Sequence, residues 1–342
     1  MEQQKKLQED EDACVYAMQL ASSSVLPMVL RSVVELGILE IITKAGPLGT
    51  EISPSDIASQ LPTQNPDAAV MVDRALRLLA SYSVVTCSLK THEDGRIERV
   101  YGQAPICKLF LPNEETGSLE KLMLMHQDKV LMHGWFHMKE AILEGGIPFH
   151  NEYGMSAFEY QGVDPRFNVL FNEAMEGQTI ITMNNLLQVY KGFEGLNSVV
   201  DVGGGFVVAL KMITSKYPSI KGINFDLPYV VAKAPSHPGV EHVEGNMFES
   251  VPKGDAIFMK NCYEALPEGG NVIIVDALLS EAAETNHVAQ AGYQIGNLMM
   301  MINPGGKERT EKDFEALAKG AGFRSYQVIC PIINLCAIKY VK

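Results

Sequence analysis

The sequence predicts an α/β protein with a mostly parallel sheet, preceded by a smaller helical domain. From Ser198 onward, short apolar runs alternate with helical patterns, as in a parallel sheet whose strands are joined by helices. The first run, Val199–Val202, is followed by three glycines and then by a predicted helix, 207–215. The last two runs, 326–333 and 335–341, are separated by a short break, which predicts an antiparallel pair at one edge of the sheet.

Length and composition narrow the functional classes. The 342 residues suffice for two domains, and the net charge of −13 argues against a nucleic acid partner, since phosphate binding needs clustered Lys and Arg. No apolar run is long enough to cross a membrane. The six cysteines lack metal-ligand spacing, so we expect no metal site and reduced thiols in a cytoplasmic protein.

The first half of the chain predicts a dimerisation domain. Residues 1–12 are charged and polar, so we expect a disordered tail. Residues 13–43 form a helical pattern that is apolar nearly all round, which favours a homodimer through the N-terminal helices over burial within one chain. Two further helices and a hairpin, 84–90 and 96–101 around an Asp-Gly turn, complete a winged-helix shape without a basic face.

We therefore expect a winged-helix-like domain over 13–115, a helical linker with substrate-pocket helices over 116–190, and the α/β domain over 191–342. The glycines after the first strand of this last domain suit the close approach of a nucleotide-like ligand. Asp226 ends the second strand, about 20 residues further on, where an acid can bind ribose hydroxyls.

Several longer runs resemble those of plant caffeic acid O-methyltransferases, and the resemblance covers nearly the whole chain. The runs are Asp-Lys-Val-Leu-Met at 128–132, Asp-Pro-Arg-Phe-Asn at 164–168, Gly-Ile-Asn-Phe-Asp-Leu-Pro at 222–228 and Asn-Pro-Gly-Gly-Lys-Glu-Arg-Thr at 303–310. The resemblance implies a dimeric cytosolic enzyme with a winged-helix dimerisation domain and a Rossmann-like S-adenosylmethionine domain. Enzymes of this family methylate phenolic hydroxyls of hydroxycinnamic acids and related compounds.

The resemblance also implies two sets of site residues. The cofactor-binding positions are Gly203, Gly205, Asp226, Met247 and Lys260. The positions that line the phenolic pocket are Leu131, Phe167, Phe171, Met175, Met299 and Asn303. An apolar, aromatic slot with few polar groups is what a planar cinnamoyl skeleton needs.

The chain departs from the family pattern at four places. The glycine loop continues as Phe206 and Val207 instead of Thr-Gly, and Asn246 replaces the family acid beside the adenine. The family His-x-Asp before residue 303 reads Gln-Ile-Gly at 294–296. Finally, Lys260 runs directly into Asn261, whereas the family has a segment that carries the histidine base which takes the phenol proton. Loss of this segment, about 16 residues, leaves a connection near the ~10–12 residue minimum for a parallel crossover.

Three titratable groups remain for chemistry: His126, Glu308 and Asp276. Glu308 and Asp276 match the two family glutamates that flank the lost histidine. His126 stands in the substrate-contacting stretch and is a candidate base. A phenol has a pKa near 10, so loss of the base predicts inefficient methyl transfer.

These departures leave three hypotheses. The leading one is a cofactor-free ring closure of an ortho-hydroxycinnamate to a coumarin, with His126 as base, Asn303 as donor, and Glu308 or Asp276 as relay. The second is a slow S-adenosylmethionine-dependent O-methyltransferase of caffeic acid-type phenolics. The third is a non-catalytic partner that dimerises with an active relative.

Overall fold

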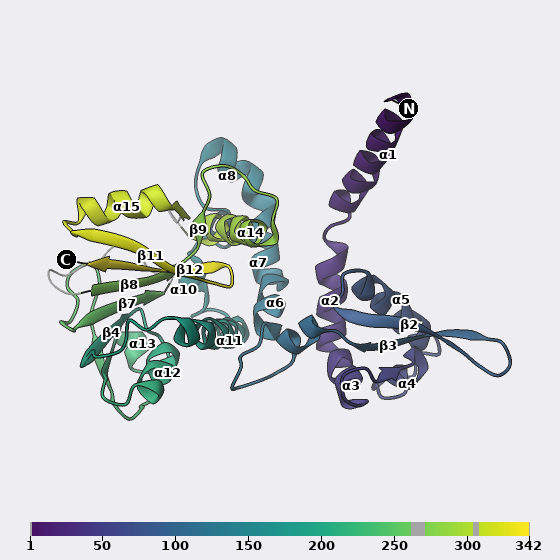
Figure 1. Cartoon of the computed structure of the whole chain (residues 1–342), viewed down its shortest axis with the longest axis horizontal. Coiled ribbons are helices and arrows are strands. Elements are labelled where there is room, and N and C mark those ends of the chain that lie inside the picture. Colours follow the sequence, from purple (N-terminus) through teal and green to yellow (C-terminus); the bar gives the residue numbers. More distant parts are fainter. Residues whose placement is uncertain (1, 261–270, 304–307, 342) are drawn as a thin grey trace. The chain divides into compact units, whose positions relative to one another are not determined.

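The computed structural model describes residues 2–260, 271–303 and 308–341 (Figure 1). The chain forms two compact units. Unit 1 comprises Met1–Glu114 and Ser118–Lys129, and unit 2 comprises Glu115–Gly117 and Val130–Lys342. Each unit is described by itself. The predicted pocket helices therefore belong to unit 2 from Val130 onward.

Unit 1 is a helical domain with a small antiparallel sheet in the order β1-β3-β2. The elements are α1 (Glu2–Ala21), α2 (Val25–Glu35), α3 (Ile38–Lys44), β1 (Glu51–Ile52), α4 (Pro54–Ala58), α5 (Ala68–Ser81), β2 (Val85–Thr91), β3 (Ile97–Gln103), η1 (Pro105–Phe110) and α6 (Glu120–His126). The predicted hairpin is confirmed, and its buried face packs with α2, α3 and α5 in one apolar core. Asp73 of α5 forms an ion pair with Arg99 of β3 and accepts hydrogen bonds from its guanidinium. It also accepts a hydrogen bond from the buried hydroxyl of Tyr101, so α5 is linked to β3 at two residues. Its bonds to the Arg99 guanidinium hold the pKa of Asp73 below its usual range.

The N-terminal residues differ from the prediction. The sequence predicts a disordered tail over 1–12, whereas helix α1 starts at Glu2. Its first turns consist largely of Glu, Gln and Lys, which are good helix formers, and Lys5 and Glu9 form an i,i+4 ion pair. The predicted apolar helix over 13–43 is divided among α1, α2 and α3, with Tyr16 and Met18 60% and 66% exposed.

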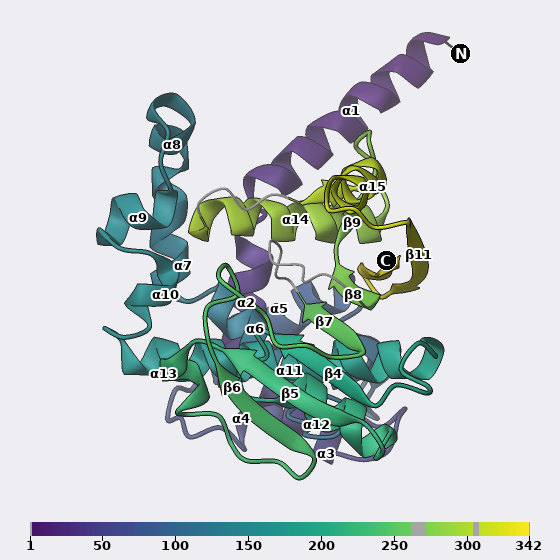
Figure 2. The same ribbon diagram turned by 90° about the vertical axis from the view of Figure 1, so that its left-hand side faces the viewer.

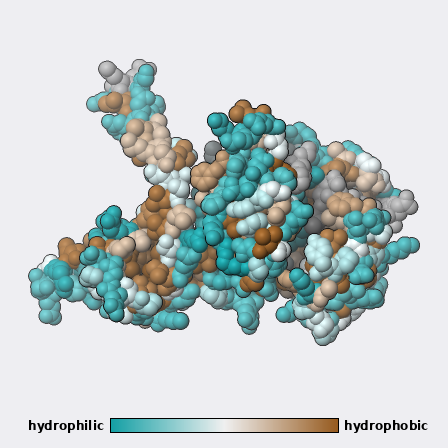
Figure 3. Space-filling model, turned by 180° about the vertical axis from the view of Figure 1, so that it is seen from behind, coloured by the Kyte–Doolittle hydropathy of each residue, from teal (hydrophilic) through white to brown (hydrophobic). Residues whose placement is uncertain are grey.

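Apolar side chains gather on unit 1 next to the N-terminal helix, as Figure 3 shows. Among the described residues, no single helix is long and apolar enough to cross a membrane. Residues Gln4–Ala21 and Val25–Glu35 meet that test by length and composition only as a pair, with a 47° bend between them.

Unit 2 contains the predicted α/β domain. Its helices are α7 (Lys129–Gly134), η2 (Trp135–His137), α8 (Met138–Glu144), α9 (Pro148–Tyr153), α10 (Ala157–Tyr160), α11 (Pro165–Val189), α12 (Val208–Lys216), α13 (Pro228–Val231), α14 (His287–Ile302) and α15 (Glu311–Gly320). Its strands are β4 (Ser198–Val202), β5 (Lys221–Asp226), β6 (Val240–Glu244), β7 (Ala256–Lys260), β8 (Asn271–Asp276), β9 (Leu278–Leu279), β10 (Arg309–Thr310), β11 (Ser325–Ile332) and β12 (Leu335–Val341).

The main sheet has seven strands in the order β11-β12-β8-β7-β4-β5-β6. Strands β4 to β8 are parallel, and β12 runs antiparallel to both β8 and β11. The predicted antiparallel pair at one edge of a mostly parallel sheet is therefore confirmed.

Both faces of the sheet are covered by helices, which explains why the central strands β4, β7 and β8 are mostly apolar and buried. On one face, Val199 packs with residues of α11 and α12. On the other face, the neighbouring residues Val200 and Val202 pack with Phe314 of α15. Figure 1 shows α12 and α15 on opposite sides of the sheet, and Figure 2 shows α14 running past β9.

The turn from β4 into α12 places a valine in a conformation that favours glycine. Val207 precedes the first residue of α12 with φ 72° and ψ 6°, the left-handed region. That conformation costs an L-residue about 1–2 kcal/mol and is an outlier for a β-branched side chain. The Val207 side chain is 2% exposed and lies in the core beneath α12, so packing holds the strained backbone in place.

We expect this strain to make a glycine variant at position 207 more stable than an alanine variant, the reverse of the usual order in helices. Val207→Gly and Val207→Ala both empty the buried site, but only glycine adopts the left-handed conformation without cost. We therefore expect Val207→Gly to be the more stable of the two variants by about 1 kcal/mol in urea denaturation.

The matched control is Val208, the next residue, which is the first of α12 and half-buried. There the usual helical order should hold, with Val208→Ala more stable than Val208→Gly by about 1 kcal/mol. If alanine is also the better residue at position 207, the left-handed strain is not present.

Candidate functional site

The parallel strands bring the predicted cofactor residues to one edge of the sheet. Gly203 follows β4, Asp226 ends β5, Met247 follows β6 and Lys260 ends β7. Because parallel strands have their carboxyl ends at the same edge, these residues line the position where open α/β sheets bind ligands. Their roles toward a ligand remain predictions.

The glycine loop and Asp226 are joined by a direct hydrogen bond. Gly203 and Gly205 have φ of 72° and 55°, so both use the left-handed conformation open to glycine. The Gly205 N–H donates to Oδ2 of Asp226 at 3.0 Å, and the Leu227 N–H donates to Oδ1 at 2.7 Å. Each carboxylate oxygen keeps a further lone pair for a ligand hydroxyl.

The space above this loop suits an adenosyl group. A Cβ built on Gly205 would have no neighbour within 4 Å, so the outer side of that backbone is open. An exposed backbone turn beside an anchored carboxylate with remaining acceptor capacity is the arrangement that a nucleoside with a ribose diol requires. The residues present therefore fit this group.

Asn246 takes a structural part in the turn after β6. Its side-chain Oδ1 accepts from the Phe248 N–H at 3.1 Å, and its Nδ2 donates to Glu249 at 3.2 Å. The amide thus shapes the backbone turn that leads through Met247, whose side chain packs at the edge of the core. Replacement of the family acid keeps this turn and removes a charge from the edge of the sheet.

Lys260 links the end of β7 to α11. Its Nζ donates to Oγ1 of Thr179 at 3.0 Å. The positive charge of Lys260 also favours the ionised form of Asp201 of β4, a side chain that is 3% exposed. Burial raises the pKa of Asp201 to about 7, and the lysine charge works against this rise.

Asp276 ends β8 and Glu308 precedes β10; the charge of Glu308 acts on Asp276, and we call these two residues the carboxyl pair. Burial raises the pKa of Asp276, as does the charge of Glu308, whereas the Ala277 N–H and the Arg309 charge lower it. The Glu308 carboxylate lies against Gly296 of α14, since a Cβ built there would be 2.3 Å from Oε2. A glycine inside a helix costs about 1 kcal/mol relative to alanine, and here it makes room for the carboxylate.

His126, the third predicted catalytic residue, lies in unit 1 at the end of α6, whereas Asp276 and Glu308 lie in unit 2. Burial lowers the pKa of His126 to about 4, so the imidazole is neutral at neutral pH and is a weaker proton acceptor than an ordinary histidine. Among the described residues, no group of three His, Cys, Asp or Glu side chains could hold a metal ion.

The predicted pocket residues come from three helices of unit 2. Phe167 and Phe171 of α11 are in ring contact with centroids 6.4 Å apart, and Phe171 meets Phe158 edge-on at the same separation. Leu131 is a buried residue of α7, and Met175 is half-buried on α11. Met299 and Asn303 are one turn apart at the end of α14, where the Asn303 N–H bonds to the Met299 carbonyl. The structure thus brings the two phenylalanines together, and the role of all six residues remains a prediction.

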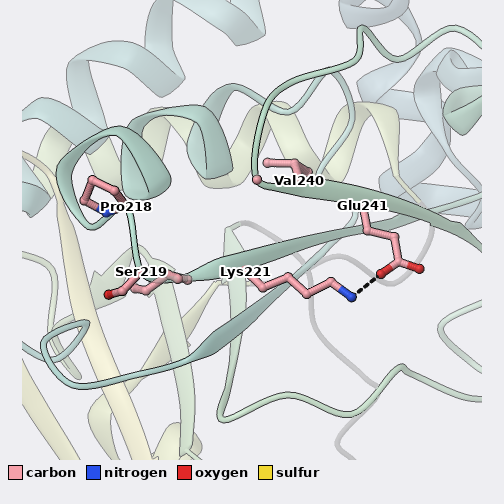
Figure 4. Close-up of a pocket in the computed structure, with 7 residues that line it drawn as sticks. Pro218, Ser219, Lys221, Val240 and Glu241 are labelled. Carbon is pink, nitrogen blue, oxygen red and sulfur yellow. Dashed lines mark ion pairs between the residues drawn. The ribbon is translucent and has the colours of Figure 1, made fainter.

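The two described cavities lie away from these residues. One of about 400 Å³ is at the amino ends of β5 and β6, opposite to the glycine loop, and Lys221 and Glu241 form an ion pair beside it (Figure 4). The other, of about 510 Å³, lies in unit 1 and is lined by Val25, Met28 and Val29 of α2 and by Ala75 of α5, among others.

Sequence reasoning missed three polar residues beneath the glycine loop: Asp201, Asn224 and His242. They lie within strands β4, β5 and β6, respectively. Polar residues within the mostly apolar strands β4 and β5 were a signal for Asp201 and Asn224 individually, whereas β6 is polar enough that His242 does not stand out.

Two family models match the chain. The O-methyltransferase dimerisation domain matches residues 18–113, and the O-methyltransferase domain matches residues 135–324. Together these matches cover well over half of the chain.

Full-length relatives point to the same family. Caffeic acid 3-O-methyltransferase of Catharanthus roseus is 57% identical over 350 aligned positions, covering 98% of this chain and 96% of the relative. The enzymes of that name from Prunus dulcis and Medicago sativa are 57% and 54% identical, each covering 97% of this chain and 95% of the relative.

The first of these alignments contains a gap in this chain. It has 350 positions, but 98% of 342 residues is only about 335, so about 15 positions of the relative have no counterpart here. The alignment length does not fix where these positions fall, so the missing segment after Lys260 stays a prediction. The residues on the far side of that junction, 261–270, lie outside the described residues.

Solved structures of lower identity show the same fold. Human N-acetylserotonin methyltransferase in complex with SAM has a TM-score of 0.76 at 19% identity, covering 96% of this chain and 97% of its own. CalO1, a methyltransferase in calicheamicin biosynthesis in an SAH-bound form, has a TM-score of 0.77 at 21% identity, covering 96% and 98%.

These findings correct two predictions. The hypothesis that the chain has lost methyl transfer and closes ortho-hydroxycinnamates to coumarins is wrong, because the O-methyltransferase domain and the full-length caffeic acid enzymes support the second hypothesis. The expectation that no cofactor is required is also wrong, because the family is one of methyltransferases and the solved neighbours hold SAM or SAH. The chain belongs to the O-methyltransferase family and combines that family's dimerisation domain with its catalytic domain.

Proposed function

We propose that this chain transfers a methyl group from S-adenosylmethionine to a phenolic hydroxyl of a caffeic acid-type substrate. The observation that supports it best is the open glycine turn hydrogen-bonded to Asp226 at the carboxyl edge of the sheet. When bound, the cofactor supplies an activated methyl group, and the chain's residues must bind both reactants and accept one proton.

Binding of the adenosyl group is assigned to the end of β4 and β5. The Asp226 carboxylate is held by two backbone N–H groups, which leaves its remaining lone pairs to accept from the ribose hydroxyls. Gly203 and Gly205 give the ligand access to the backbone, and Met247 and Lys260 flank it from the neighbouring strands.

The substrate is assigned to the apolar helices of unit 2. Phe167 and Phe171, whose rings contact each other at an angle of 53°, supply aromatic surface for a cinnamoyl ring. By family resemblance we assign Leu131, Met175 and Met299 to the same pocket as apolar lining and Asn303 as its polar group. This arrangement favours a planar phenol over an aliphatic alcohol.

The phenol proton is assigned to the carboxyl pair. Burial gives Asp276 a raised pKa, which makes its carboxylate a stronger proton acceptor than an ordinary aspartate. The charge of Glu308 acts on Asp276, and Glu308 is the second carboxylate that we assign to this step. His126, neutral at neutral pH, remains a second candidate acceptor. The sequence predicts that the family histidine is missing, and on that basis we expect turnover about 10²–10⁴-fold slower than with a dedicated base.

We further propose a cytoplasmic homodimer formed through the N-terminal helices. Helix α1 exposes Leu7, Tyr16, Met18 and Leu20, each 56% or more, which is unusual unless a second copy covers them. The five described cysteines are free, in keeping with a reducing compartment.

The first test is direct methylation. Purified full-length protein with S-adenosylmethionine and caffeic acid should yield caffeate carrying one more methyl group, identified by mass spectrometry. We expect Asp226→Ala to raise the KM for S-adenosylmethionine about tenfold or more, because two ribose hydroxyls lose a charged acceptor. Asp94→Ala, at the exposed tip of the unit 1 hairpin, is the matched control. No product, together with no calorimetric heat from millimolar S-adenosylhomocysteine, would contradict the proposal.

The second test concerns the proton acceptor. A carboxylate base must be ionised, so the rate should fall as pH drops through its pKa, and the raised pKa of Asp276 should move this fall to a higher pH than for an ordinary aspartate. We expect Asp276→Asn and Glu308→Gln each to lower kcat about 10–100-fold and to alter this acidic limb.

Glu315→Gln is the control for these two variants, because Glu315 pairs with Lys319 on the exposed side of α15. Its kcat and pH profile should match those of the unsubstituted chain. An unchanged acidic limb in both Asp276→Asn and Glu308→Gln would remove the carboxyl pair from the proton transfer.

A further inference from the structure

A row of polar side chains crosses three neighbouring strands beneath the glycine loop. The strand register pairs Asp201 of β4 with Asn224 of β5, and Asn224 with His242 of β6. Asn224 is fully buried and Asp201 is 3% exposed. Buried polar groups are costly unless they are hydrogen-bonded, so the burial of Asp201 and Asn224 in the sheet needs a reason.

Asn224 is the centre of this row. Its Nδ2 donates to the Gly205 carbonyl at 3.2 Å and to Nδ1 of His242 at 3.1 Å. Nε2 of His242 faces the Pro235 carbonyl at 3.2 Å. Since a carbonyl oxygen can only accept, Nε2 must carry the proton and Nδ1 must accept. His242 thereby fixes the orientation of the Asn224 amide, with its NH₂ group toward the loop.

The loop rests directly on this row. A Cβ built on Gly204 would lie 2.2 Å from Oδ1 of Asn224 and 2.8 Å from Oδ2 of Asp201. The amide and the carboxyl group therefore fill the space that a side chain at position 204 would need. Among the described atoms, Oδ1 of Asn224 has no hydrogen-bond partner. The site tolerates that unpaired acceptor, which indicates that the contact with the loop outweighs its cost.

Gly205 is thus held on both sides of its α-carbon. Its N–H bonds to Asp226 and its C=O bonds to Asn224. With both groups fixed, the left-handed turn at Gly205 has one orientation, and the open side of its backbone faces away from the sheet. Loss of either bond leaves one peptide group free to rotate.

We propose that Asn224, oriented by His242, is a positioning residue that holds the glycine loop in the form that binds the adenosyl group. This inference rests on the proposed function. Asn224 lies beneath the loop rather than against the ligand, so it acts through Gly205. His242 acts one step further away, by accepting from the amide that holds the carbonyl.

The experiment measures S-adenosylhomocysteine binding to the full-length chain by calorimetry. Asn224→Leu removes the donor to Gly205 at similar volume, and His242→Phe removes the acceptor that orients Asn224. We expect Kd to rise about tenfold in each, the usual effect of losing one buried hydrogen bond. His242→Asn offers an amide oxygen near the position of Nδ1 and should restore most of the affinity. His287→Phe, an exposed position at the start of α14, should bind as tightly as the unsubstituted chain.

Two further readouts separate positioning from general destabilisation. Hydrogen exchange in peptides that contain Gly205 should be faster in Asn224→Leu and His242→Phe. The KM for S-adenosylmethionine should rise, whereas the KM for caffeic acid should change less than twofold. Should Asn224→Leu fail to fold, the comparison of His242→Phe with His242→Asn decides, because His242 is only half-buried.

The outcomes distinguish this inference from the proposed function. If the unsubstituted chain does not bind S-adenosylhomocysteine, the proposed function fails. If it binds, and His242→Phe and Asn224→Leu bind equally well with unchanged exchange around Gly205, the positioning role is overturned. Equal weakening by His242→Phe and His242→Asn would also overturn it, because the acceptor at Nδ1 would then be irrelevant.

Discussion

The site depends on one constraint, the left-handed turn that ends β4. A chain that leaves a buried parallel strand must reverse into a helix without burying unpaired peptide groups. Here the turn meets that condition with Gly205, whose N–H and C=O are bonded to Asp226 and Asn224, two residues of the same neighbouring strand. Strand β5 therefore fixes the loop from the side and from below. The open side of the loop, and hence any ligand placed on it, takes its position from β5.

The sequence predicts much of this fold because the pattern is local. The apolar runs at 199–202, 256–259 and 271–275 agree with β4, β7 and β8 to within a residue at each end, and the Asp-Gly turn marks the hairpin of unit 1. The first half of helix α1, residues 2–12, was not predicted, because charge suggested disorder where helix propensity prevails. The polar row beneath the loop could not be predicted either. Strand order and register place Asp201, Asn224 and His242 side by side. Neither can be predicted from a short stretch of sequence.

In the candidate site, too, some residues can be predicted from a short stretch of sequence, whereas contacts between distant segments cannot. Asp226 follows from its position at the end of a strand, about 20 residues after the glycines. Gly296 reads as a simple loss of the family aspartate, yet the Glu308 carboxylate occupies the space that a side chain at 296 would fill. A side chain at position 296 and the present position of the Glu308 carboxylate exclude each other, and this contact is not visible in the sequence.

The departures from the family pattern differ in how much they lower cofactor affinity or reaction rate. Strain at Val207 amounts to about 1–2 kcal/mol, and even if all of it opposed ligand binding, affinity would fall by about 5–30-fold. Loss of a dedicated base costs about 10²–10⁴-fold in rate, since a phenol with a pKa near 10 is almost fully protonated at neutral pH. Under the proposed function, proton removal therefore limits turnover more than cofactor binding does. Burial raises the pKa of Asp276, which brings the basicity of its carboxylate closer to that of the phenolate. This shift makes Asp276 a better proton acceptor and so reduces the loss of rate.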